Sequence, residues 1–325
     1  AHGPRRRVVG KTILAIRNLI VFQIVQHRRK YFLFSASIIG LGLVAMIISL
    51  ISAGSPFQIG VDFRSGTRME IQFQEPVSED GIRRVFNEFD INNPAVASIQ
   101  GAGLENTWQI RTEFLDTDTA EDIQTELSTQ LSPLEPDTTR IDSVSPAVGQ
   151  EVTRAAFGAV FIAALIILVY IMFAFRQIPN SFRYGACAVA AMLHDILIIL
   201  GFMAITGMLL GWEVDALFLT AVLTVAGFSL QDTNVVFDRI RENLQRRPRD
   251  YFESIANRSI LETIHRSMVT QLAAMFVMVA LLLFGGASIK HFIAVLFIGL
   301  LSGTYSSIFT AVPLLVELEG RASTA

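Results

Sequence analysis

Two carboxylates and one guanidinium group lie in runs of apolar residues that are long enough to cross a lipid bilayer. Asp195 and Asp232 lie inside two such runs, and Arg266 opens a third. A charge at the centre of a helix in lipid costs about 2.5 kcal/mol or more on insertion scales, so these side chains should face protein or water and have partners. A carboxylate beside a cation inside a membrane can take up and release a proton.

Asp232 and Arg266 are the pair that we expect to do this chemistry. The predicted span with Asp232 runs inward and the next span returns, so both residues lie at a similar depth in the inner half of the membrane. Burial favours the protonated carboxyl group and a neighbouring arginine favours the carboxylate, so conformation can decide whether the proton is bound. The other interpretation is a fixed salt bridge that holds two helices together.

His194 and Asp195 form a second polar pair near the middle of a predicted span. They are candidates for proton transport, or they only hydrogen-bond to neighbouring helices, and the sequence leaves both interpretations open. A His-Asp pair can also belong to a metal site or a protease, but we find neither a second ligand cluster nor a paired intramembrane aspartate motif. We therefore expect no metal ion, no cofactor and no enzymatic activity.

Small and polar residues surround the candidate site in the sequence. Gly227 and Ser229 precede Asp232 and allow a helix to pack closely or to bend. The supporting polar or flexible residues that we expect are Gly227, Ser229, Gln231, Thr233 and Thr270.

The composition predicts a polytopic α-helical membrane protein. The chain has 325 residues, of which 52% are hydrophobic and 17% charged, and its mean hydropathy is +0.49. These values exclude a disordered chain and disfavour an ordinary soluble domain. The single cysteine, Cys187, excludes an internal disulfide and a cysteine-based metal site. Six runs have the length that a ~30 Å hydrocarbon core requires, namely 31–53, 153–175, 184–206, 214–237, 266–286 and 290–315.

The distribution of basic residues predicts the orientation in the membrane. Residues 1–30 carry eight Lys/Arg and no acid, Arg176 and Arg183 flank one turn, and the segment 238–265 is rich in arginine. The positive-inside rule places all of these on the cytoplasmic side. The expected organisation is a basic cytoplasmic segment at 1–30, a first span at 31–53, an extracytoplasmic domain at 54–152, five further spans within 153–315 with a cytoplasmic loop at 238–265, and a cytoplasmic tail at 316–325.

The domain at 54–152 is acidic, with 18 Asp/Glu and 6 Lys/Arg. Its hydrophobic periodicity predicts strand, helix, strand, strand, helix and strand, which is the order of a ferredoxin-like α+β fold. Ser78 is expected to cap the first helix, and Asp118 is expected to open the second with Glu121 at capping-box spacing. This fold supports many functions and predicts no activity by itself.

The segment 11–27 has the pattern of an amphipathic helix. One interpretation places it as an interfacial helix on the inner membrane surface. The other is an ordinary cytoplasmic lead-in to the first span.

Several motifs along the chain resemble those of a known family. They are "HRRKYFLFSASIIGLGL", "GVDFRSGT", "LHDILIILGF", "QDTNVVFDRIREN", "NRSI", "HRS" and "FGGASIKHFIAVLFIGLLSGTYSS". Together with six spans and an external domain after the first, they resemble SecF, the smaller half of the bacterial SecDF protein-export factor, in the RND superfamily. Four positions depart from the usual family pattern, in that Arg64 and Ser65 replace Thr-Gly, Gln231 replaces Asn and Phe228 replaces Tyr.

The resemblance implies a function and partners. SecF-like proteins pair with SecD in a twelve-span unit, associate with the SecYEG translocon in the bacterial inner membrane and use the proton gradient to assist the export of unfolded polypeptide chains. By position, Asp232 and Arg266 match the intramembrane Asp and Arg that the family uses for proton passage. The lipid bilayer and protons are then further partners, and no nucleic acid is expected. The alternatives are an RND-like proton-coupled exporter of a lipid or small hydrophobic molecule, and a non-transporting scaffold for the translocon.

Overall fold

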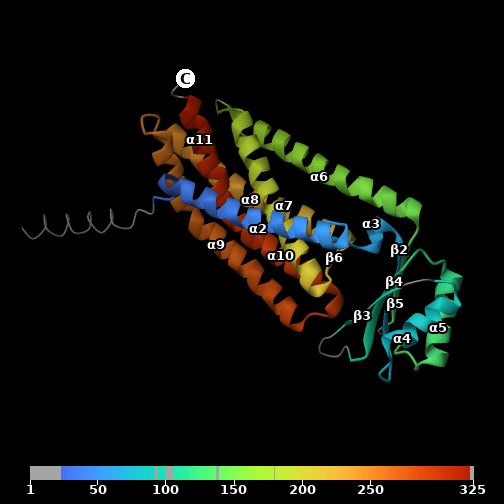
Figure 1. The fold of residues 1–325 in the computed structure, drawn as a ribbon. Helices are drawn as coiled ribbons and strands as arrows, with labels where there is room; N and C mark the ends of the chain where they lie inside the picture. The colour runs from blue at the N-terminus through green and yellow to red at the C-terminus, as the bar shows by residue number, and fades with distance from the viewer. Residues whose placement is uncertain (1–22, 92–93, 100–104, 137–138, 179, 323–325) are drawn as a thin grey trace, which may run out of the picture.

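Six helices in the described residues are long and apolar enough to cross a membrane, as predicted. The computed structural model describes residues 23–91, 94–99, 105–136, 139–178 and 180–322 (Figure 1). The spans are α2 (Arg28–Ala53), α6 (Pro146–Ala174), α7 (Ser181–Leu210), α8 (Ala216–Arg246), α9 (Phe252–Phe284) and a last span made of α10 (Ala287–Ser306), a π-helical turn η2 (Ser307–Ala311) and α11 (Val312–Ala322). Their outer faces expose large apolar side chains such as Leu33, Phe157 and Phe276, which suits contact with lipid.

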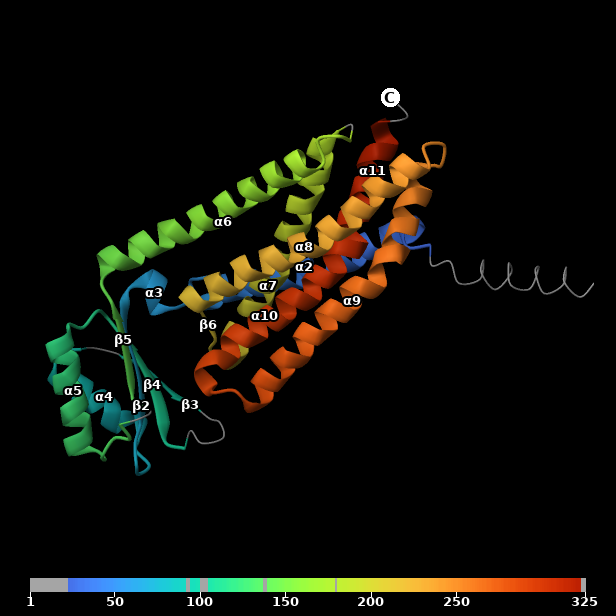
Figure 2. The same ribbon diagram turned by 180° about the vertical axis from the view of Figure 1, so that it is seen from behind.

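The segment between α2 and α6 contains an α+β domain, which lies at one end of the helix bundle (Figures 1 and 2). Its elements are β2 (Gly66–Gln72), α4 (Glu79–Glu88), β3 (Ala95–Ile99), β4 (Thr107–Thr112), α5 (Thr117–Gln130) and β5 (Arg140–Val144). The sheet order is β3-β4-β2-β5 with every neighbouring pair antiparallel, which is the ferredoxin-like arrangement. Both helices cover one face of the sheet, and the other face is directed towards the bundle.

The core of this domain follows the predicted helical and strand periodicities. Met69 and Ile71 of the sheet pack against Ile82, Phe86 and other apolar residues of the two helices. Burial of each such side chain stabilises the domain by about 1.5–3 kcal/mol.

One of the two predicted helix N-caps is confirmed and the other is wrong. Ser78 caps α4 and accepts a hydrogen bond from the amide of Gly81, as expected. The prediction for α5 was wrong, because Asp116, rather than Asp118, accepts from the amide of Thr119. Asp118 instead lies in the first turn, where its charge favours the helix macrodipole.

The long helices extend beyond the apolar runs, so two expected boundaries are corrected. The segment 238–265 was expected as a loop, but α8 continues to Arg246 and α9 begins at Phe252. Ion pairs such as those of Arg239 with Glu242 and Glu262 allow the helices to continue outside an apolar environment. The amphipathic helix expected at 11–27 lies mostly outside the described residues.

A close crossing of α2 and α7 brings the first and third spans together. A Cβ atom on Gly201 would lie 2.7 Å from the Cα atom of Gly42, so only glycine fits at this contact. Seven residues earlier on both helices, Ser35 and His194 are also in contact, with 3.0 Å between Oγ and Nε2. Two contacts with the same spacing show that the helices run parallel and fix their register.

Two short elements attach the α+β domain to the bundle. The two-residue strand β1 (Gln58–Ile59) pairs in parallel with β6 (Glu213–Val214), which lies in the turn between α7 and α8. The short helix α3 (Val61–Arg64) follows, and the carboxylate of Asp62 accepts a hydrogen bond of 2.9 Å from the amide of Ala216 at the start of α8. None of these elements was predicted from the sequence, because they are too short to show periodicity.

The turn after α3 explains why the family pattern has glycine there. Ser65 has φ 64° and ψ 161°, a conformation that is almost restricted to glycine. Gly66 has φ 127°, and a Cβ atom on it would lie 2.6 Å from the carbonyl oxygen of Thr112. The serine therefore occupies a strained position that glycine would adopt without strain.

The helix crossing predicts the effect of a single methyl group. Gly201→Ala should destabilise the protein by about 1–3 kcal/mol, because the added methyl group overpacks the contact with Gly42. Gly40→Ala is the matched control, since a Cβ atom there meets nothing within 4 Å. Thermal unfolding of the purified protein in detergent measures both variants, and equal midpoints for the two would contradict the assigned crossing.

Candidate functional site

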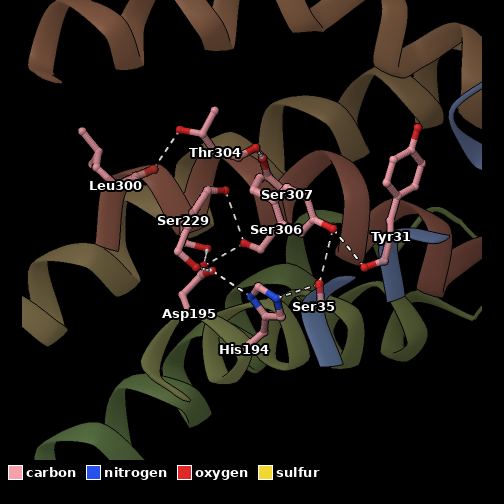
Figure 3. A network of polar contacts seen from close by, with 12 residues as sticks. Tyr31, Ser35, His194, Asp195, Ser229, Leu300, Thr304, Ser306 and Ser307 are labelled. Atoms are coloured by element: carbon pink, nitrogen blue, oxygen red, sulfur yellow. Dashed lines mark hydrogen bonds and ion pairs between the residues drawn. The ribbon is translucent and has the colours of Figure 1, made fainter. Parts of the chain in front are cut away.

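Asp195 lies midway along α7 and is buried inside the bundle. Only 1% of its surface is exposed. Three serine hydroxyls donate to its carboxylate: Ser302 to Oδ1 at 2.6 Å, and Ser229 and Ser306 to Oδ2 at 2.7 Å each (Figure 3). Because the donors come from α8 and α10, the carboxylate joins three spans.

His194 extends this cluster towards the first span. Its Nδ1 lies 3.1 Å from Oδ1 of Asp195, and its Nε2 lies 3.0 Å from Oγ of Ser35 on α2 (Figure 3). The Ser35 hydroxyl lies 3.5 Å from Oη of Tyr305, which in turn donates to the backbone carbonyl of Tyr31 at 2.9 Å. The polar contacts therefore form one connected network from Asp195 to the N-terminal part of α2.

The network adjoins an irregular part of the last span. The π-helical turn η2 begins at Ser307, directly after Ser306, which donates to Asp195. Ser306 and Ser307 are both fully buried. Short π-helical segments are rare and often mark functional sites.

Asp232 is midway along α8 and faces α9. It is 5% exposed, and its Oδ2 accepts a hydrogen bond of 2.7 Å from Nε2 of Gln271. The side chain of Ser267, one turn earlier on α9, also hydrogen-bonds to it. Ser229, the Asp195 ligand, lies three residues before Asp232 on the same buried face of α8, so this helix carries both centres.

The ion pair between Asp232 and Arg266 that was considered from the sequence is not formed among the described residues in this conformation, and the role of both residues in proton transport stays a prediction. Arg266 is exposed and makes no ion pair with a described residue, and Thr270, one turn further, is exposed as well. Arg266 does not face Asp232 because successive residues of a helix are rotated by about 100° around its axis. Ser267 and Gln271 face Asp232, which places Arg266 on another side of α9.

The supporting residues named from the sequence have different positions. Ser229 and Thr233 are buried, whereas Gln231 is exposed. Gly227 is exposed too, and a Cβ atom on it would meet nothing within 4 Å, so the structure assigns it no close packing. Sequence analysis missed Ser35, Ser302, Ser306, Tyr305, Ser267 and Gln271 as members of the two centres. The four-residue spacing of Ser302 and Ser306 in an apolar run was the available signal.

A third charged centre joins the α+β domain to the bundle. Glu213 of β6 is 7% exposed; its Oε1 lies 2.7 Å from Nε of Arg111, and its Oε2 lies 3.6 Å from Nη1 of Arg68. Arg68 also pairs with Asp142 at 2.8 Å. We call Glu213, Arg111 and Arg68 the domain clamp. Burial raises the pKa of Glu213, and the two arginines oppose this effect because they favour the carboxylate.

A cleft of about 380 Å³ lies beside the clamp, between the sheet and the bundle. Its walls contain Arg68, Arg111, Glu213 and His291 as well as Trp212. The charged lining does not suit an apolar ligand. No group of three His, Cys, Asp or Glu side chains within the described ranges could hold a metal ion.

Two family descriptions match this chain. "Protein export membrane protein SecD/SecF, C-terminal" matches residues 123–321, and "SecD/SecF GG Motif" matches residues 51–77. The second match includes the strained turn at Ser65 and Gly66.

Proteins called protein translocase subunit SecF are similar over almost their whole length. The relative from Anaerolinea thermophila is 40% identical over 92% of this chain and 94% of its own. The relative from Thermobaculum terrenum is 41% identical over 93% of this chain and 95% of its own. The protein translocase subunit SecDF of Bacillus subtilis is 31% identical over 90% of this chain, which corresponds to 38% of that longer protein.

A solved structure has the same fold. The crystal structure of SecDF, a translocon-associated membrane protein from Thermus thermophilus, superposes with a TM-score of 0.75 and 27% identity. The match covers 93% of this chain and 40% of that chain.

The Asp195 cluster predicts a cost for removing a single hydroxyl group. Ser302→Ala should destabilise the protein by about 1–3 kcal/mol, because a buried carboxylate loses one of its donors. Ser52→Ala is the control, since its exposed hydroxyl binds only carbonyls of its own helix. Thermal unfolding in detergent compares the two, and an unchanged midpoint for Ser302→Ala would show that this donor is dispensable.

Proposed function

The chain belongs to the SecF family of protein translocase subunits, and on that premise we propose that it couples the proton-motive force to protein export. It pairs with SecD in a twelve-span unit of the bacterial inner membrane. This unit assists the passage of unfolded polypeptides through the SecYEG channel. Both termini lie in the cytoplasm and the α+β domain lies on the outer side, in keeping with the eight Lys/Arg of residues 1–30.

The observation that carries this proposal is the buried, ionisable Asp232 in the middle of a membrane-spanning helix. Its partners in the described residues, Gln271 and Ser267, are neutral, so no cation compensates the carboxylate in this conformation. An uncompensated buried carboxylate favours proton uptake. The site can therefore bind a proton in one conformation and release it in another.

Arg266 supplies the second conformation. Its exposed guanidinium group lies next to Ser267 in sequence, so a rotation of α9 exchanges the neutral partners of Asp232 for a cation. Arginine near Asp232 favours release of the proton. In the present conformation its exposed position makes it available for contact with SecD.

The available energy is sufficient for a conformational bias. One elementary charge that moves through 100 mV gains about 2.3 kcal/mol. This amount changes a two-state equilibrium by roughly fifty-fold. The domain clamp then transmits movement of α7 and α8 to the α+β domain, because Glu213 lies in the turn between these helices.

The two alternative functions receive less support. An exporter of lipids or small hydrophobic molecules requires an apolar pocket, whereas the cleft beside the α+β domain has charged walls. A non-transporting scaffold requires only structural polar contacts. The donors around Asp195 suit this role, but Asp232 has no compensating cation among the residues that the structure describes.

Replacement of Asp232 tests the proton-coupling proposal. Asp232→Asn keeps the hydrogen bond to Gln271 but cannot ionise, so we expect loss of most gradient-dependent export with normal abundance and SecD association. Asp238→Asn is the control on the same helix, because Asp238 is an exposed partner of Arg241. Export into inverted membrane vesicles, with and without an uncoupler, measures both. Unchanged gradient dependence in Asp232→Asn would make the carboxylate structural and favour the scaffold.

Replacement of Arg111 tests transmission through the domain clamp. Arg111→Met should speed hydrogen exchange around the paired amide of Gly60 at least about tenfold, since loss of one partner of a buried ion pair costs about 3 kcal/mol or more. Gradient-dependent export should fall in parallel. Arg83→Met removes an exposed ion pair of the same domain and should change neither quantity. Faster exchange with full export would exclude the clamp as the transmitting contact.

A further inference from the structure

We infer that the Asp195–His194 pair is a second proton-binding site, in which His194 carries the exchangeable proton and Asp195 remains ionised. The assignment deepens the proposed function, on which its use in export rests. In this assignment the exchangeable proton is on the histidine and not on the carboxylate.

The donors around Asp195 select its ionised form. Three hydroxyls and the His194 ring nitrogen surround the carboxylate, two at each oxygen. An ionised carboxylate has about four acceptor sites and no donor, so this set matches it fully. A proton on Asp195 would displace one of these donors, whereas hydrogen bonds donated to the charged form stabilise that form.

The negative charge then requires a positive one. The elements that pack around Asp195 present hydroxyls: Ser35 from α2, Ser229 from α8, and Ser302, Ser306 and Tyr305 from α10. Within the described part of the chain, no lysine or arginine forms an ion pair with it, and the one ionic partner is His194. Since an unpaired buried charge is costly, a proton on the imidazole compensates the carboxylate.

The hydrogen bonds beyond His194 have a consistent direction only in the protonated form. An imidazolium donates from both nitrogens, from Nδ1 to Asp195 and from Nε2 to Ser35. The Ser35 hydroxyl is then free to donate to Tyr305, which donates to the Tyr31 carbonyl. When His194 is neutral, Ser35 must donate to Nε2 instead, and Tyr305 loses that donor.

Protonation of His194 therefore changes the hydrogen bonds that connect three spans. Bound at Nε2, the proton completes a chain from Asp195 on α7 through Ser35 on α2 to Tyr305 on α10. Loss of the proton breaks the chain at the link between Ser35 and Tyr305. The adjoining π-helical turn at Ser307–Ala311 interrupts the α-helical pattern of this span, so it is placed to respond.

Nitrogen NMR of the full chain tests the inference directly. The protein, ¹⁵N-labelled at histidine and reconstituted in lipid nanodiscs, contains five histidines, and His194→Gln assigns the signal. We expect the His194 signals to show an imidazolium that becomes a neutral imidazole when the pH is raised, with Nδ1 protonated in both forms. A His194 that stays neutral throughout the titration overturns the inference.

Replacement of Asp195 identifies the compensating charge. Asp195→Asn should reduce the ratio of imidazolium to neutral imidazole at pH 7 about tenfold or more, because the ionic partner is lost. Asp238→Asn is the control and should leave the His194 titration unchanged. A titration that is equal in Asp195→Asn and the unmodified protein contradicts the pairing. If Asp195→Asn does not fold, the titration of the unmodified protein decides the question.

The His194 titration, compared with export in the same variant, separates this inference from the proposed function. Asp232→Asn should leave the titration of His194 in place whatever its effect on export, because the two aspartates have different partners. A titrating His194 with no dependence of export on Asp232 would support the second site and contradict the proposed role of Asp232. A permanently neutral His194 with lost export in Asp232→Asn would do the opposite.

Discussion

The bundle depends on one requirement, which is that a carboxylate in the middle of a membrane-spanning helix must have hydrogen-bond donors. Asp195 meets it with serines from α8 and α10 and with its neighbour His194. Because hydroxyl groups on short side chains reach only a few ångströms, the helices that carry them must cross closely and in one register. The contact between Gly42 and Gly201 fulfils the same condition for α2, since it lies seven residues along both helices from the contact between Ser35 and His194. The close glycine contact and the hydrogen bonds of the buried carboxylate therefore both require the same close crossing of the helices.

The second carboxylate is held in a contrasting way. Asp195 has three hydroxyl donors and the His194 ring nitrogen close by, whereas Asp232 has an amide and a hydroxyl from one helix and no cation among the described residues. The two centres share α8, with Ser229 and Asp232 one turn apart on its buried face. A displacement of α8 that changes the contacts of Asp232 with α9 must also change the donor that Ser229 gives to Asp195. This shared helix connects the two polar centres physically, without direct contact between the carboxylates.

The sequence predicted what depends on hydrophobic pattern and missed what depends on the direction of side chains. The six spans and the α+β domain follow from apolar runs and from periodicity, which survive errors of a few residues at each boundary. The predicted contact between Asp232 and Arg266 was based on equal depth, and depth does not determine which face of a helix a residue occupies. The serines around Asp195 resembled the small residues of any close helix contact, and only the fold shows that they converge. The arginine partners of Glu213 come from strands more than a hundred residues away in the chain, so no local pattern could have predicted them.

The join between the α+β domain and α6 has a mechanical consequence. Strand β5 ends at Val144 and α6 begins at Pro146, so a single residue, Ser145, separates the sheet from the span. Across its length α6 is mostly exposed, and both views show it at the edge of the bundle (Figures 1 and 2). A helix of 29 residues is about 43 Å long, so a tilt of about 10° around its far end displaces the attached sheet by about 7 Å. A small tilt of α6 within the bilayer therefore moves the attached α+β domain by several ångströms.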